Sequence, residues 1–203
     1  MAKFKSIDTS YNGHRFRSRL EARWALYFDL IGIKYEYEPQ GYYLESGICY
    51  LPDFYLPNVS AYAEIKPKSI SIDDLSDAME KIEEVAFNNG KFALICVGDP
   101  MDNSIKLCGR IANEYGNGWQ WETAEFIYGA ELLEDCGLTI REVFDVGIVV
   151  GDRGNRNITR VAKADDKEIH TVIPFSKLYG YQGIPYEEQE RARQARFEHG
   201  EDL

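Results

Sequence analysis

The residues of this chain best suited to chemistry are two carboxylates and a lysine. Asp53 lies in one short apolar segment, and Glu64 and Lys66 lie in the next, after a turn at Pro57-Asn58. Side chains alternate between the two faces of a strand, so Glu64 and Lys66, two residues apart, share a face. Where neighbouring strands bring Asp53 beside them, the two carboxylates offer the hard oxygen ligands that Mg²⁺ prefers.

Such a group of side chains is suited to the hydrolysis of phosphodiester bonds. A bound Mg²⁺ lowers the pKa of a water ligand and neutralises charge on a phosphoryl oxygen. The ammonium group of Lys66 can orient that water or stabilise developing negative charge. Glu-x-Lys is also a common pattern on the solvated face of a strand, so this interpretation depends on what the neighbouring segments contribute.

A predicted helix upstream of these segments contributes a third acid. Ser18 is a good N-cap, Glu21 follows at the capping-box position, and Gly32 is placed to end the helix. Glu21 has two interpretations that the local sequence does not separate. Its carboxylate caps backbone N–H groups, or it projects toward the metal. Four apolar residues at helical spacing predict the buried stripe of this helix: Leu20, Trp24, Tyr27 and Ile31.

The first hundred residues predict an α/β (α+β) fold with a mixed central sheet. The apolar segment 91–99 fits a strand buried on both faces. It follows the Glu64/Lys66 strand after a helix, and a βαβ unit of this kind is normally parallel. The expected order is an irregular lead-in (1–13) with a turn at Asn12-Gly13, a helix, three strands (33–39, 48–57 and 61–66), a helix (within 69–90) and a strand (91–99).

The rest of the chain predicts two further parts. Segments within residues 101–182 have the composition of strands, with a short helix near residues 131–143. Residues 183–203 are highly charged with few apolar anchors, which fits an exposed helix or partial disorder. We therefore divide the chain into a core (1–100), a β-rich acidic extension packed on or next to it (101–182) and a charged tail (183–203).

Composition indicates a globular protein, since 44% of its 203 residues are hydrophobic and 13% are aromatic. No apolar run approaches the length of a membrane span, and the first ten residues hold no hydrophobic signal core. We therefore expect a cytoplasmic protein without a membrane partner. The four cysteines form no C-x-x-C pair, which favours reduced thiols over a structural zinc site: Cys49, Cys96, Cys108 and Cys136.

The net charge of −11 is distributed unevenly along the chain. Residues 1–68 hold 9 Lys and Arg against 8 Asp and Glu, whereas residues 69–203 hold 14 against 26. Binding to phosphates requires Lys and Arg. The charge therefore permits a nucleic-acid partner at the N-terminal part of the chain and a protein partner at the acidic residues 69–203.

Together these residues resemble the PD-(D/E)xK nuclease superfamily. Pro52-Asp53 gives the PD motif, Glu64-Ile65-Lys66 gives ExK after a gap of ten residues, and Glu21 matches the acid of the preceding helix. The runs FRSRLEARWA, YEYEPQGY, YLPDFYLP and EIKP look like those of small nuclease-like proteins encoded by phages and prophages. The resemblance covers roughly residues 11–98.

The resemblance implies a restriction-endonuclease-like α-β-β-β-α-β core and a metal-dependent nuclease. Asp53 and Glu64, with the Ile65 carbonyl and Glu21, would bind one or two Mg²⁺ or Mn²⁺ ions. Lys66 would position or help deprotonate the attacking water.

The implied substrate is DNA, with RNA left open. Endonuclease, exonuclease, nickase and junction-resolving activities all stay open, as does the oligomeric state. Three residues before or at the start of the helix would be placed to hold the nucleic-acid backbone: Arg15, Arg17 and Arg19.

Two other classes of function stay open as well. A non-catalytic acidic protein on this fold could block or recruit a protein partner, as a DNA mimic or anti-defence protein does. A structural or assembly protein would act through residues 101–203. A retired active site would be expected to have lost Asp53, Glu64 or Lys66, and all three are present, which favours the nuclease.

Overall fold

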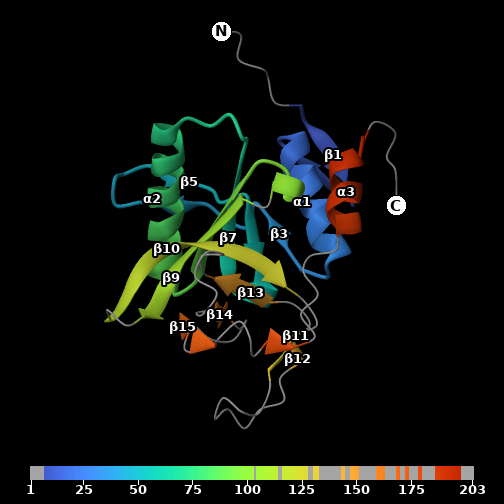
Figure 1. Ribbon diagram of the computed structural model, residues 1–203. Helices are drawn as coiled ribbons and strands as arrows, with labels where there is room; N and C mark the ends of the chain where they lie inside the picture. Colours follow the sequence, from blue (N-terminus) through green and yellow to red (C-terminus); the bar gives the residue numbers. More distant parts are fainter. Residues whose placement is uncertain are drawn as a thin grey trace.

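The computed structural model shows a mixed β-sheet flanked by helices, an α+β fold (Figure 1). Helices α1 (Arg19–Leu30) and α3 (Tyr186–Gln194) lie on one side of the sheet, and α2 (Ile72–Asn89) lies on the other. No helix in the described part of the chain is long and apolar enough to cross a membrane. The described residues are 7–102, 104–113, 116–127, 130–132, 143–144, 147–150, 159–162, 168–169, 172–173, 178–179 and 186–197.

The main sheet has the strand order β3-β6-β7-β8-β9-β10-β13-β14-β16, and β15 pairs with β9. Its pairs are antiparallel except β7 with β8 and β15 with β9, which are parallel. Helix α2 connects β7 to β8, so the predicted parallel βαβ unit is confirmed. The strands are β3 (Glu36–Tyr37), β6 (Phe54–Leu56), β7 (Ala61–Lys66), β8 (Phe92–Val97), β9 (Ser104–Asn113), β10 (Gly116–Ile127), β13 (Gly147–Val150), β14 (Thr159–Ala162), β15 (Glu168–Ile169) and β16 (Val172–Ile173).

The other described strands form three small sheets. Strands β1 (Thr9–Tyr11) and β2 (His14–Phe16) make one hairpin, and β4 (Tyr42–Tyr43) and β5 (Cys49–Tyr50) make another. The third sheet joins β12 (Val143–Phe144), β11 (Ala130–Leu132) and β17 (Leu178–Tyr179). Two single-turn 3₁₀ helices follow β6 and β8: η1 (Pro57–Val59) and η2 (Pro100–Asp102).

Helix α1 begins and ends where its caps predict. The Ser18 hydroxyl accepts the Glu21 backbone N–H at 3.1 Å, and Gly32 follows the helix with a φ of +75°. Helix α2 is bounded in the same way by Ser71 and by Gly90, whose φ is +61°.

Alternation along β7 divides its side chains between two hydrophobic cores. Ala61, Ala63 and Ile65 belong to the core under α1, whereas Tyr62 belongs to the core under α2. Residues two apart share a face, so Glu64 lies on the α2 side with Tyr62. The predicted facing of this strand is confirmed.

Strand β9 continues the sheet directly from β8, across residue 100. Leu107 lies in the core under α1, and Cys108 in the core under α2. Gly109 of β9 packs tightly against Phe92 of β8. A Cβ at position 109 would lie 2.2 Å from the Phe92 ring, so no larger residue fits there without a shift. The first strands of the acidic extension thus form part of the same sheet as β7, which carries Glu64 and Lys66.

Helix α3 packs on α1. Ala192 is fully buried in the core under α1, and the rings of Tyr11 and Phe197 meet edge to face with centroids 5.7 Å apart. Strand β1 and helix α3 therefore both lie beside α1 (Figure 1).

Three predictions of local structure are wrong. Residues 9–16 form the β1–β2 hairpin, because Asn12 and Gly13 take the positive φ angles, +46° and +76°, that a tight hairpin turn needs. The predicted strand 48–57 is two strands, β5 and β6, interrupted around Pro52, which has no N–H to donate to a ladder. Part of the short helix predicted near 131–143 is strand, in β11 and β12, and residues 133–142 lie outside the described residues.

Candidate active site

Asp53 lies at the interruption between β5 and β6, one residue before β6 begins. Its side chain is almost fully buried, and each carboxylate oxygen has a partner. Oδ2 accepts the backbone N–H of Ile65 at 2.8 Å, and Oδ1 lies 3.2 Å from a guanidinium nitrogen of Arg17. The bond to Ile65 fixes the carboxylate of Asp53 against β7, the strand that carries the ExK motif.

Glu64 and Lys66 lie next to each other on β7. Lys66 Nζ donates to Glu64 Oε1 at 2.5 Å, and the Tyr50 hydroxyl donates to Glu64 Oε2 at 2.6 Å. The Glu64 side chain is 7% exposed and that of Lys66 is 25% exposed, so the lysine is the more accessible of the pair. The structure brings these two residues together as the sequence predicts.

Glu21 caps α1. Its Oε1 accepts the Ser18 hydroxyl at 2.6 Å, and its Oε2 accepts the Arg17 backbone N–H at 3.2 Å and the Tyr37 hydroxyl at 2.7 Å. The capping interpretation is therefore confirmed. Glu21 is also buried and near enough to Asp53 to raise the pKa of that residue, so the capping role does not exclude an electrostatic one.

The three predicted nucleic-acid-binding arginines lie in different places. Arg17 reaches the acidic residues, with Nε 2.6 Å from Glu38 Oε1 as well as its contact to Asp53. Arg15 lies on the β1–β2 hairpin and pairs with Asp8. Arg19 starts α1 and lines a separate pocket between α1 and the C-terminal segment.

The electrostatic environment of Asp53 is that of an incomplete site. Burial, followed by the charge of Glu64 and by a smaller contribution from Glu21, raises the pKa of Asp53 to about 8. The N–H of Ile65 and the charge of Lys66 act in the opposite direction but are outweighed. Burial and Glu64 also raise the pKa of Tyr50, which keeps its hydroxyl a donor to Glu64. More cationic charge near Asp53 would favour its ionised form.

The donor set fits a hard divalent cation in its chemistry. Asp53 and Glu64 are buried carboxylates, and burial together with the charge of Glu64 raises the pKa of Asp53 despite its contact with Arg17, so a further cation would stabilise its ionised form. The N–H and C=O of one residue in a strand point to the same side, so the Ile65 carbonyl faces the edge where its N–H meets Asp53. In the described residues no group of three or more Asp, Glu, His or Cys side chains is arranged as a complete metal site. The candidate ligands are therefore Asp53, Glu64 and the Ile65 carbonyl, with Glu21 held by its capping bonds.

Two tyrosines of the site were not predicted from the sequence. Tyr37 bonds Glu21, and Tyr50 bonds Glu64, each through its hydroxyl. Tyr37 also accepts the Arg17 N–H at 3.0 Å. Tyr37 lies within the YEYEP run and Tyr50 begins the YLPDF run, which was the available signal in the sequence. Which tyrosine hydroxyls reach an acid depends on contacts between separate elements, and the sequence does not give these contacts.

Comparison of the sequence with models of known protein families gives no match, and comparison with curated proteins gives none either.

Proposed function

We propose that this protein is a metal-dependent nuclease that hydrolyses DNA phosphodiester bonds. The observation that carries the proposal is the convergence of Asp53, Glu64 and Lys66 at the C-terminal end of β7, with two buried carboxylates and a raised Asp53 pKa. Buried carboxylates with perturbed pKa values are typical of functional sites rather than of structural ion pairs alone.

The order of elements supports the same proposal. Helix α1 precedes β3, β6 and β7, and these are followed by α2 and β8, with β7 parallel to β8. Apart from the small β4–β5 hairpin between β3 and β6, this order matches the α-β-β-β-α-β order expected of a restriction-endonuclease-like core, which supports the proposal. Asp53 precedes the second of the three strands, and Glu64 and Lys66 lie on the third, as the PD-(D/E)xK pattern requires.

Each residue of the site has a role in the proposed mechanism. Asp53, Glu64 and the Ile65 carbonyl would hold Mg²⁺ or Mn²⁺, which when bound supplies charge neutralisation at the phosphoryl oxygens and an acidified water. The Lys66 ammonium group, fixed by Glu64 Oε1, orients the attacking water and stabilises the negative charge that develops on the phosphate, while the proton of the water passes to solvent. The water oxygen forms a bond to phosphorus, and the bond from phosphorus to the leaving sugar oxygen breaks.

Two residues position these groups. Tyr50 holds Glu64 Oε2, and Tyr37 holds Glu21 at the start of α1. Arg17 lies against Asp53 with a side chain that is 58% exposed, so it is accessible to a phosphate of the substrate.

The experiment is a cleavage assay on supercoiled, linear, single-stranded and branched DNA and on RNA, with Mg²⁺, Mn²⁺ or EDTA. Lys66→Ala is compared with Lys68→Ala, two residues further along, where the lysine is exposed and pairs with Asp102. We expect Lys66→Ala to lower the rate by about 10²–10³-fold, because it removes the cation that orients the water and stabilises developing negative charge. Lys68→Ala should retain the activity of the wild-type protein.

Cleavage that persists in EDTA, or that both variants lose equally, would contradict the proposed site. Should the wild-type protein leave every substrate intact and calorimetry detect no Mg²⁺ or Mn²⁺ binding, the nuclease proposal is rejected. The non-catalytic acidic binding protein is then the function to test.

A further inference from the structure

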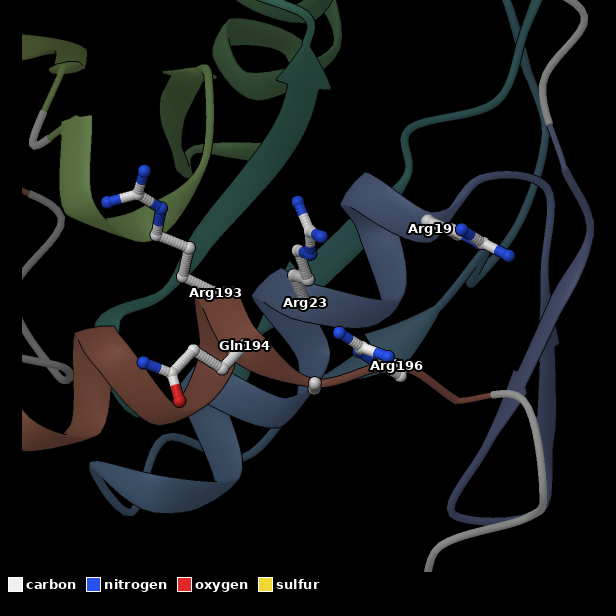
Figure 2. Close-up of a pocket in the computed structure, with 6 residues that line it drawn as sticks. Arg19, Arg23, Arg193, Gln194 and Arg196 are labelled. Carbon is white, nitrogen blue, oxygen red and sulfur yellow. The ribbon is translucent and has the colours of Figure 1, made fainter.

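Four arginines surround a cavity of about 460 Å³ between α1 and the C-terminal segment. Arg19 and Arg23 come from α1, Arg193 comes from α3, and Arg196 follows α3 (Figure 2). Gln194 and Ala195 complete the described lining, in which no residue is acidic. We call this cavity the arginine pocket.

Helix geometry explains why these arginines converge. Arg19 and Arg23 are four residues apart and share a face of α1. Glu21 lies midway between them in sequence, and at about 100° per residue it projects from the opposite face. Burial of Ala192 in the core under α1 fixes α3 in place, which brings Arg193 to the same side of α1 as Arg23.

Two arginines of the pocket have weak compensation or none within the described residues. Arg193 Nε lies 3.9 Å from an Asp99 carboxylate oxygen, and another nitrogen of Arg193 contacts the Met101 sulfur at 3.5 Å. Arg23 Nε is buried and has no hydrogen-bond partner in the part of the chain that the structure describes. A buried donor without a partner costs free energy, so an anion that pairs with Arg23 would stabilise the folded protein.

The chemistry of the lining identifies the ligand class. The planar guanidinium fork matches phosphate oxygens in a bidentate geometry, and four such groups suit a phosphate group better than a single carboxylate. An apolar ligand would bury charged groups without pairing them, at a large cost in free energy.

We propose that the arginine pocket binds a backbone phosphate of the nucleic-acid strand, an inference that rests on the proposed nuclease function. Arg17 contacts Asp53 in the proposed active site and lies two residues before Arg19, at the N-terminal end of α1, so a strand that passes this end of the helix meets cationic side chains on both faces. The distance from Arg17 to Arg23 along the chain is on the order of 10 Å, about three nucleotides of a strand. A linear polyanion can contact both places at once, whereas a free phosphate ion contacts only one.

Fluorescence anisotropy with a labelled oligonucleotide tests the proposal, in EDTA so that no cleavage occurs and over about 50–200 mM salt. The pocket variants are Arg23→Met and the exposed Arg196→Gln. The matched control is Arg191→Gln, an exposed arginine of the same helix that lies near Tyr11 and outside the pocket lining. Melting curves confirm that each variant is folded.

Each pocket variant should weaken binding by about 5–10-fold and reduce the slope of log K against log salt by about 1. The control should stay within about twofold of the wild-type affinity. Pocket variants that bind as the wild type does, while Lys66→Ala abolishes cleavage, would overturn the pocket and leave the nuclease proposal standing.

Two further outcomes separate the sources of phosphate and the two proposals. Weakened binding by the pocket variants in a protein that cleaves nothing would support the pocket and reject the nuclease. Inorganic phosphate alone is also titrated into the wild type and into Arg23→Met, and the melting temperature of each protein is measured. A thermal shift by phosphate in the wild type alone, without oligonucleotide binding, would overturn the nucleic-acid assignment in favour of a free anion.

Discussion

The two faces of helix α1 differ in the sign of their charged side chains and in how far these are neutralised. On one face, Glu21 and the nearby Asp53 are buried and hold hydrogen bonds to defined donors, as Glu64 does to Tyr50. On the other face, the arginine pocket gathers like charges, and Arg23 Nε has no hydrogen-bond partner in the described residues. Pre-organised acids suit chemistry, which requires fixed geometry, whereas exposed like charges suit binding of a flexible polyanion.

The largest effect on cleavage is expected from Asp53→Asn, which removes one of the two buried carboxylates of the candidate site. We expect a loss of cleavage of at least about 10²-fold, because the site loses an anionic ligand. The same change should raise thermal stability in EDTA near pH 8. Melting curves across the pH range and the cleavage assay check the two expectations.

The sign of the stability effect follows from the pKa of Asp53, which is about 8 in the folded protein against 3.8 for an ordinary Asp. Between these values the folded protein keeps a proton that the unfolded chain releases, so wild-type stability falls as the pH rises from about 4 to about 8. Asn does not titrate, and the variant should lack this fall. Mg²⁺ should restore stability at high pH to the wild type only. An identical pH dependence in the two proteins would contradict the burial of an uncompensated Asp53.

A smaller effect is expected from Tyr50→Phe, which removes the hydroxyl that donates to Glu64 at 2.6 Å. Hydrogen bonds to charged groups contribute about 1.5–3 kcal/mol, which for a chain of this size corresponds to a fall of roughly 3–10 °C in Tm. Tyr43→Phe is the matched control, since that side chain is 77% exposed. Equal melting temperatures for the two variants would show that the Tyr50 bond is not part of a rigid site.

The smallest effect is expected in the arginine pocket, where a substitution should raise the melting temperature rather than lower it as Tyr50→Phe does. Arg23→Met keeps the apolar stem, removes the unpaired Nε and relieves repulsion with Arg19. The variant should therefore melt roughly 1–4 °C above the wild type in a buffer without multivalent anions, equivalent to about 0.5–1 kcal/mol. Added phosphate should narrow the difference, because it stabilises only the wild type. A variant less stable than the wild type would mean that Arg23 is already neutralised.

Local signals in the sequence predict most of the elements that carry the acids. Ser18 and Gly32 bound α1, and alternation from Tyr62 to Lys66 predicts β7 and its facing, because caps and periodicity depend on residues close in sequence. The break at Pro52 was misread as continuous strand, since the apolar residues on both sides of it mask the missing donor.

Contacts between residues far apart in the chain could not be predicted from local patterns in the sequence. Arg17 pairs with Glu38 and Asp53, 21 and 36 positions later, and α3 packs on α1 from the other end of the chain. Glu21 shows what local patterns fail to predict within the site. It forms the capping bonds and also raises the pKa of Asp53, and the sequence near Glu21 does not reveal that it does both. The arginine pocket is not visible in sequence, since its two halves come from α1 and from a segment that composition alone describes as a solvated tail.

The docking of α3 on α1 has a consequence for the order in which the protein acquires its properties. Helix α3 follows α1 by roughly 150 residues, which at ~5–20 residues per second of synthesis is a delay of about 8–30 s. During that interval the place of Ala192 in the core is unfilled and two arginines of the pocket do not yet exist. A nascent chain therefore lacks the complete arginine pocket until residues 193–196 have been synthesised, and if the pocket binds nucleic acid as proposed, it binds less tightly before then.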